Sequence, residues 1–166
     1  MGTKEDLGAA FAGESQANRR YLFFADKADQ EGHPQVARLF RAAAEAETVH
    51  ARNHFQVTGG VKSSAENLAA AIGGEHYEFT QMYPGMIKQA ETEKNDAARN
   101  SFDLANKVEK VHHTLFKSAL SAVEQNKEQA DKPFFVCQRC GNTVEGQAPD
   151  RCPICGAPRS MFKHID

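Results

Sequence analysis

Residues 102–112 read F-D-L-A-N-K-V-E-K-V-H and repeat a pattern found earlier in the chain, F-R-A-A-A-E-A-E-T-V-H at 40–50. At an offset of 62 residues the two strings share a phenylalanine, an alanine, a glutamate, a valine and the final histidine. Both end in Glu-x-x-His, and residues three apart lie on the same face of a helix. Each string therefore predicts a helix that presents a carboxylate and an imidazole on one side.

The second string contains two adjacent histidines, and local helix geometry alone cannot choose between them. His112 and His113 lie three and four residues after Glu109, so either one could share its face. In the repeat, Glu47 aligns with Glu109 and His50 aligns with His112, whereas an alanine stands opposite His113. The repeat selects His112, and we expect His113 to lie beside the site without binding metal.

A second pair of strings adds one glutamate to each copy. A-A-F-A-G-E at 9–14 and A-A-I-G-G-E at 70–75 agree at four of six positions, at an offset of 61 residues. Each copy is therefore a helix pair with one glutamate on its first helix and Glu-x-x-His on its second. Carboxylates that face a core need a compensating cation, and this oxygen-rich donor set suits iron or manganese better than structural zinc. The predicted ligands are Glu14, Glu47, His50, Glu75, Glu109 and His112.

One further glutamate has no counterpart in the repeat. Glu78 lies one turn after Glu75, and the residue that corresponds to it at the same offset is Ala17. Because Glu78 shares a helix face with Glu75, we expect it to be a seventh ligand. The two metals would then be inequivalent.

Apolar residues spaced by threes and fours predict four helices, over about 3–29, 35–58, 64–92 and 95–126. Gly32, Pro34 and the Gly59-Gly60 pair supply stop signals, and Ser63 or Ser64 is a candidate cap for the third helix. Pro84 is expected to kink that helix or disturb one turn. The predicted fold is an all-α four-helix bundle over residues 1–130, followed by a small metal-binding domain over residues 131–166.

All four cysteines lie in the C-terminal part, in the pattern C-x2-C-x11-C-x2-C. Two paired clusters indicate a tetrahedral metal site rather than disulfides. So short a segment buries little apolar surface, so metal binding must supply most of its folding free energy. The spacing does not distinguish iron from zinc and, taken alone, favours zinc. The ligands are Cys137, Cys140, Cys152 and Cys155, and the polar stretch 126–133 is the expected linker.

Composition excludes several classes of function. The formal net charge is −2 with mixed signs along the chain, so there is no basic footprint for nucleic acid and no polybasic membrane patch. No apolar run approaches the roughly 20 residues that a membrane-spanning helix needs. The polar N-terminus has no apolar signal region, and we expect a cytoplasmic protein.

Together these motifs resemble the rubrerythrin family, over nearly the whole chain. The resemblance implies a ferritin-like di-iron bundle and a rubredoxin-like domain, with two irons in an oxo/carboxylate-bridged site and one iron on the four cysteines. It implies that Glu78 and His50 exchange as ligands with redox state, and that two tyrosines hydrogen-bond to ligating carboxylates. These tyrosines are Tyr21 and Tyr83, and the implied catalytic set is Glu78, His50, Tyr21 and Tyr83.

The function implied by the resemblance is reduction of hydrogen peroxide to water, with electrons passed through the rubredoxin-like iron. Electrons would come from a rubredoxin or an NAD(P)H-dependent reductase, because the chain has no G-x-G-x-x-G fingerprint. His112 lies about 20 Å before the end of its helix, so we expect the linker to leave far from its own cluster. A head-to-tail homodimer would shorten that path. The alternatives are a ferroxidase or iron-handling protein, and a zinc-loaded structural or interaction protein.

Overall fold

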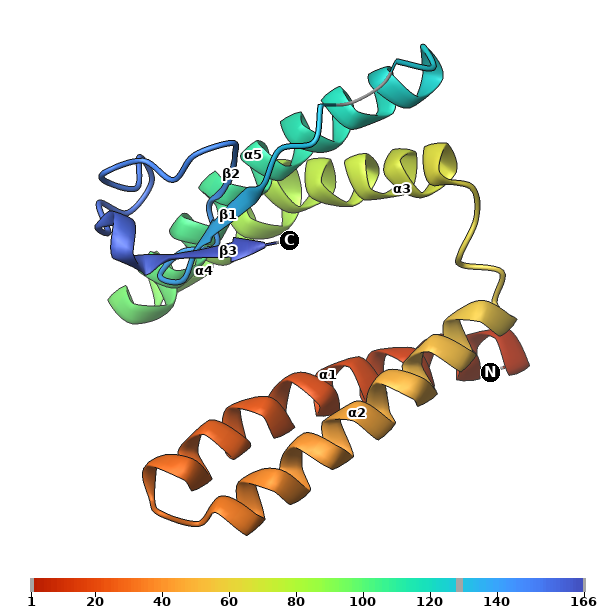
Figure 1. Cartoon of the computed structure of the whole chain (residues 1–166), viewed down its shortest axis with the longest axis vertical. Helices are drawn as coiled ribbons and strands as arrows, with labels where there is room; N and C mark the ends of the chain where they lie inside the picture. The colour runs from red at the N-terminus through yellow and green to blue at the C-terminus, as the bar shows by residue number, and fades with distance from the viewer. Residues whose placement is uncertain (1, 128–129, 166) are drawn as a thin grey trace. The chain divides into compact units, whose positions relative to one another are not determined.

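The computed structural model describes residues 2–127 and 130–165. The chain forms two compact units that divide between Lys62 and Ser63, and Figure 1 draws both. The first unit is a helix pair. The second unit holds three further α-helices and a small three-stranded sheet, so the two copies of the sequence repeat fall in different units.

The first unit consists of two antiparallel helices, α1 (Thr3–Gln30) and α2 (Pro34–Val57). Small residues such as Ala25 and Ala37, which have no exposed surface, let the helices approach closely, and Phe40 packs against them. Asn18 ties the pair together, because its amide donates to the Ala44 carbonyl oxygen at 2.7 Å. Both helices begin and end within one residue of the predicted bounds.

The second unit begins with α3 (Ser64–Tyr77), which continues through a π-helical turn, η1 (Glu78–Met82), into α4 (Tyr83–Thr92). The last helix is α5 (Asp96–Glu124). Ser63 caps α3 by accepting a hydrogen bond from the Glu66 backbone N–H, and Asn95 caps α5 in the same way from Ala98. The predicted third helix is therefore one continuous rod with a widened turn in its middle.

The sequence led us to expect that Pro84 would kink this helix or disturb one turn, and the structure shows a disturbed, widened turn. Pro84 lacks an N–H and its ring crowds the preceding turn, which cannot keep regular α-helical bonding. The Tyr83 N–H donates instead to the Glu78 carbonyl oxygen, five residues back. This turn also accounts for the change of offset in the repeat. Glu14 and Glu75 are 61 residues apart, whereas Tyr21 and Tyr83 are 62 apart, and a π-helical turn accommodates one extra residue.

The C-terminal segment forms an antiparallel sheet of three short strands, β1 (Phe134–Cys137), β2 (Thr143–Glu145) and β3 (Phe162–Ile165). The strand order is β2-β1-β3, and a single 3₁₀ turn, η2 (Arg159–Met161), precedes β3. The core of this small domain is built from Cys137, Cys152 and Ala157, with Phe162 packed against them. The sheet and its loops are called the ribbon below.

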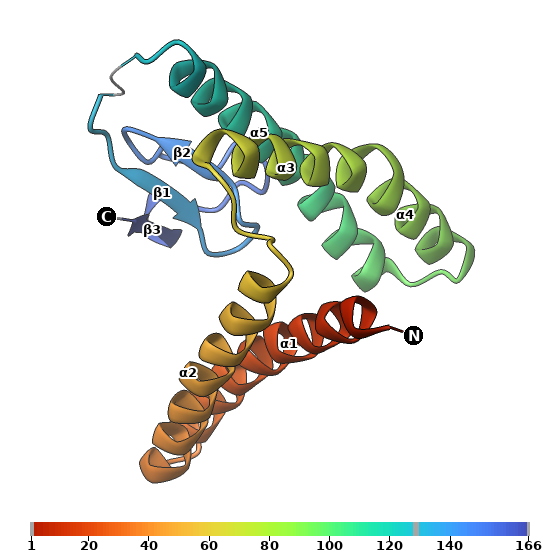
Figure 2. The ribbon, with the colours of Figure 1, turned by 90° about the vertical axis from the view of Figure 1, so that its right-hand side faces the viewer.

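The ribbon lies against α5 of its own chain, as Figures 1 and 2 both show. The Thr143 hydroxyl in β2 is 3.0 Å from Nε2 of His112, and Gly141 faces Val108. Ser118 of α5 and Phe134 of β1 line one depression together. The chain leaves α5 at Glu124, about three turns beyond His112, as the sequence led us to expect, but the ribbon turns back along α5 and contacts His112. Residues 128 and 129 of the predicted linker lie outside the described residues.

Candidate metal centres

The first unit contains a cluster of three metal-ligating side chains, and each of its residues comes from the repeat. Glu14 projects from α1, whereas Glu47 and His50 project from α2 one turn apart. Nδ1 of His50 is 2.8 Å from Oε2 of Glu47 and 3.9 Å from Oε1 of Glu14. The potential ligand atoms lie within 4.8 Å of one another.

The second unit contains the matching cluster, formed by Glu75 of α3 with Glu109 and His112 of α5. Nδ1 of His112 is 2.8 Å from Oε2 of Glu109 and 3.9 Å from Oε1 of Glu75. These two distances equal those of the first unit. The sequence repeat is thus also a repeat of donor geometry, and each helix pair carries one half-site of two carboxylates and one imidazole.

The His112 ring lies between the Glu109 carboxylate and the ribbon. Its Nε2 is 3.0 Å from the Thr143 hydroxyl, which is itself 3.2 Å from the Gly141 carbonyl oxygen. Its Nδ1 is 2.8 Å from Oε2 of Glu109. The Nε2 contact with the ribbon orients the ring, and Nδ1 and the carboxylate are the two groups of this pair that could ligate a cation.

The charges in this half-site are not balanced by the protein alone. Burial, followed by the negative charge of Glu109, raises the pKa of Glu75 from its ordinary 4.5 to about 7. The pKa of Glu78 is raised for the same two reasons, partly opposed by His112. Burial and the same carboxylates also raise the pKa of Tyr83. A cluster that resists ionisation in this way is suited to a multivalent cation.

The raised pKa of Glu75 predicts how the metal-free protein responds to pH. Below about pH 4.5 the side chain is protonated in both the folded and the unfolded states. Between about 4.5 and 7 only the unfolded chain ionises, so the free energy of unfolding should fall with rising pH, by at most about 3 kcal/mol. Urea unfolding of chelator-treated protein at pH 5 and pH 8, followed by helical circular dichroism, measures this. Glu75→Gln should remove most of the fall, and an equal fall in that variant would contradict the assignment.

Three further residues were predicted to belong to the site, namely Glu78, Tyr83 and Tyr21. Glu78 is the first residue of the π-helical turn and lies outside the tight cluster, although Glu109 acts on its pKa. Burial, followed by the charges of Glu109, Glu78 and Glu75, raises the pKa of Tyr83. Tyr21 packs against the ring of Phe40 in the first unit. The expected hydrogen bonds from both tyrosines to ligating carboxylates stay predictions.

His113 lies beside the second half-site, as expected from the repeat. Its ring packs against Phe79 and His76, at centroid distances of 5.4 and 5.7 Å. It does not belong to the metal-ligating clusters found among residues 2–127 and 130–165. The structure thus groups His112 with two carboxylates and leaves His113 beside them, and metal binding by His112 stays a prediction.

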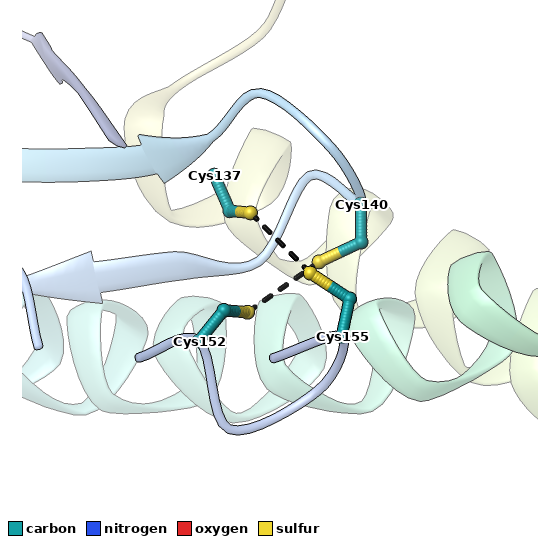
Figure 3. Close-up of side chains that lie close together, drawn as sticks. All are labelled: Cys137, Cys140, Cys152 and Cys155. Carbon is teal, nitrogen blue, oxygen red and sulfur yellow. Dashed lines mark hydrogen bonds between the residues drawn. The ribbon is translucent and has the colours of Figure 1, made fainter. Parts of the chain in front are cut away.

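The four cysteines of the ribbon converge as Figure 3 shows, and they are not joined as disulfides. Sγ of Cys137 is 3.7 Å from Sγ of Cys155, and Sγ of Cys140 is 3.6 Å from Sγ of Cys152. Four sulfurs at metal–sulfur distances of about 2.3 Å would lie about 3.8 Å apart at the corners of a tetrahedron. The site therefore has the dimensions of a four-thiolate metal centre.

Backbone N–H groups support the cysteine sulfurs. Gly141 and Gly156, which follow the two cysteine pairs, have φ of 83° and 73°, a left-handed conformation that glycine adopts readily. Burial opposes ionisation of Cys152, but the N–H groups of Cys155 and Ile154 outweigh it and lower its pKa to about 7. The thiolate that a metal binds is thus favoured at this position.

The sequence did not identify Thr143 as a partner of the metal ligand His112. The two residues are 31 positions apart in the chain and belong to the two parts that the cysteine pattern and the helical pattern separate. Neither periodicity nor motif spacing links a ribbon strand to a particular helix turn. This contact became visible only with the ribbon seated on α5.

Two matched carboxylate–histidine half-sites on helix pairs and an appended four-cysteine ribbon define the class of ferritin-like di-iron proteins with a rubredoxin-like domain. Comparison with known families agrees. The rubrerythrin family matches residues 5–120, and the rubredoxin-like domain of rubrerythrin matches residues 135–163. The chain belongs to the rubrerythrin family.

Individual relatives cover nearly the whole chain. Rubrerythrin-2 from Clostridium acetobutylicum is 34% identical, over 97% of this chain and 95% of its own length. Nigerythrin from Nitratidesulfovibrio vulgaris is 33% identical, over 96% of this chain and 85% of its own length. A solved structure described as the partially reduced state of nigerythrin has a TM-score of 0.60 at 32% identity, and covers 99% of this chain and 87% of the other.

Family membership confirms the predicted fold class and cofactors. The protein is a ferritin-like helical protein with a rubredoxin-like ribbon, and its donor sets match two irons at the carboxylate–histidine site and one iron at the four cysteines. The zinc favoured by cysteine spacing alone gives way to iron. The two family matches fall on either side of the predicted boundary at residue 130, which stays a prediction. Within the described residues, no helix has the length and apolar character to cross a membrane.

Proposed function

We propose that this protein is a non-haem di-iron peroxidase that reduces hydrogen peroxide to water and protects against oxidative stress. The reaction consumes two electrons and two protons for each peroxide and releases two water molecules. The observation that carries the proposal is the contact between the four-cysteine loop and His112, made through Thr143. A centre for electron input thus lies next to a ligand of the carboxylate site. Iron storage by a ferroxidase needs no such input, which favours the peroxidase.

The proposed iron ligands are the residues of the two half-sites together with Glu78. Each half-site offers two carboxylates and one imidazole, which is too few for a pair of irons. The di-iron carboxylate pattern takes one glutamate from each of two helices and Glu-x-x-His from each of the other two. We therefore assign the centre to Glu14, Glu47, His50, Glu75, Glu78, Glu109 and His112.

When bound, two ferrous ions supply both electrons for cleavage of the O–O bond in one encounter. The protein would supply negative charge to the irons and a coordination position that can become vacant. The glutamates would offset the cationic charge, and the position of Glu78 outside the tight cluster supports a ligand that leaves the metal in one redox state. We propose that Glu78 and His50 exchange as ligands with redox state, while Tyr21 and Tyr83 orient the ligating carboxylates.

Electrons are proposed to reach the four-cysteine iron from a separate rubredoxin or NAD(P)H-dependent reductase. The chain has no dinucleotide-binding fingerprint of its own. The head-to-tail homodimer predicted from the sequence remains a prediction about assembly. The dimer was predicted in order to shorten the distance between the four-cysteine iron and a carboxylate site. A dimer is less necessary for this purpose, because the ribbon contacts His112 of the same chain.

Stopped-flow reoxidation of the fully reduced protein tests the function. The visible absorption of the four-cysteine iron should bleach on reduction and return rapidly on mixing with peroxide, and more slowly on mixing with dioxygen. Faster return with dioxygen would favour the ferroxidase. A colourless protein that contains zinc in both centres would favour the structural alternative and would contradict the proposed peroxidase function.

Glu78→Ala provides a sharper test of the proposed ligand exchange. The variant should retain both half-site clusters, because Glu78 is not part of either. We expect its peroxide-dependent reoxidation to slow by about 10- to 100-fold, the usual range for residues that support a metal site. Glu91→Ala on the neighbouring helix α4 is the matched control and should react at the wild-type rate. Wild-type kinetics in Glu78→Ala would remove this residue from the mechanism.

A further inference from the structure

The hydroxyl of Thr143 occupies a position between the two metal centres of the second unit. It lies 3.0 Å from Nε2 of His112 and donates to the Gly141 carbonyl oxygen at 3.2 Å. The His112 side chain is 27% exposed, so this contact is partly shielded from water. The hydroxyl therefore bridges the imidazole of His112 and the carbonyl of Gly141.

The same peptide group continues this bridge to a cysteine. The carbonyl of Gly141 and the N–H of Asn142 belong to one peptide unit, and the Asn142 N–H donates to the sulfur of Cys140. Asn142 is 2% exposed, so the loop is held in the interior of the ribbon. The connection from the sulfur to the imidazole therefore consists of three hydrogen bonds and one peptide plane.

Packing keeps the loop in register with α5. Gly141 faces Val108, a residue of α5 that is 2% exposed and lies one helical turn before His112. The left-handed backbone at Gly141 directs the following peptide toward Thr143. One end of the bridge is His112 of α5, and the other is the loop that carries Cys140. Thr143 itself is not a metal ligand, so a substitution there alters the contact without removing one.

We infer that Thr143 is a positioning residue that fixes His112 with Nδ1 toward Glu109 and Glu75 and couples the four-cysteine loop to the carboxylate site. With iron held in both centres, this bridge would carry one electron from a ferrous ion on the cysteines, which would become ferric, to a ferric ion on the carboxylates, which would become ferrous. No atom or proton is transferred. The inference rests on the proposed electron-input role of the ribbon, but it does not depend on which oxidant the protein consumes.

Three variants separate the hydroxyl from the rest of the side chain. Thr143→Val keeps the shape and removes both hydrogen bonds, whereas Thr143→Ser keeps the hydroxyl. Thr114→Val is the matched control, because Thr114 is exposed on α5, the helix of His112, and its hydroxyl donates to the Lys110 carbonyl oxygen. All three are prepared as iron-loaded protein, and the visible absorption of the four-cysteine iron reports that the ribbon is folded.

The first measurement needs no peroxide. Flash reduction of the oxidised holoprotein is followed by the return of four-cysteine iron absorption as the electron moves to the carboxylate site. Thr143→Val should slow this return by about 10- to 100-fold, while Thr143→Ser and Thr114→Val should stay close to the wild type. The rate of iron release to a chelator is the second readout, and it should rise only in Thr143→Val.

The inference is overturned if Thr143→Val matches the wild type in both measurements. It is also overturned if Thr143→Ser is as slow as Thr143→Val, or if Thr143→Val loses its four-cysteine absorption, because the side chain would then serve only to fold the loop. Failure of the wild type to react with peroxide would refute the proposed function and leave these flash-reduction results standing on their own.

Discussion

Glu109→Gln is expected to abolish iron binding at the second half-site and to lower peroxide turnover by more than about 100-fold. The Glu109 carboxylate lies 2.8 Å from Nδ1 of His112, and its charge raises the pKa of both Glu75 and Glu78. Glutamine preserves the shape of the side chain and removes the charge that a cation needs. Iron content per chain and steady-state peroxide consumption measure the two effects.

A second, metal-free readout separates loss of a ligand from misfolding in this variant. Removing the charge at Glu109 should return the pKa of Glu75 toward its ordinary 4.5, so the metal-free variant should be more stable than wild type near pH 8. Glu124→Gln, an exposed glutamate at the end of the same helix, should change neither iron content nor turnover. A Glu109→Gln protein with a full complement of iron would show that the cluster is not a metal site.

Cys152→Ser is expected to unfold the ribbon while the helices remain intact. Cys152 is 3% exposed and belongs to the small core of this domain, which has few other buried side chains. Binding of a metal by four thiolates contributes on the order of 10–16 kcal/mol to the folding of such small domains. We expect loss of the visible absorption of the four-cysteine iron and rapid proteolysis after residue 130, with unchanged helical circular dichroism.

The same variant separates electron input from peroxide chemistry. Turnover driven by a reductase should fall by about 100-fold or more, because the entry point is missing. Chemically reduced variant should still be reoxidised by peroxide, since its carboxylates and histidines are untouched. Ser160→Ala, an exposed change in the same ribbon, is the control. Full reductase-driven turnover without the four-cysteine iron would exclude the ribbon from the electron path.

Much of this architecture follows from local signals in the sequence. Helix ends were predicted within about two residues, because capping groups such as Ser63 and Asn95 and stop signals such as Gly32 act on adjacent backbone. The internal repeat also singled out His112 over His113. Donor atoms three residues apart on a helix have a fixed geometry, so matched strings produced half-sites with matching distances.

The effect of Pro84 could be predicted only in part. A proline inside a helix removes one hydrogen bond, but the neighbouring residues determine whether the helix kinks or widens. Here the chain carries one extra residue between Glu75 and Tyr83 relative to the first repeat, and a π-helical turn accommodates it. The offsets that reveal this residue were present in the sequence, but the hydrogen bond from Tyr83 to Glu78 was not.

The sequence by itself determined the helices, the two half-sites and the four-cysteine centre, because each depends on residues that are close in the chain or alike in two copies. Only the tertiary structure decided where the ribbon lies. The contact between Thr143 and His112 joins residues 31 positions apart, and it depends on the path by which the chain returns along α5. Docking of one surface on another is fixed by packing and hydrogen bonds over many residues at once, so no local pattern encodes it.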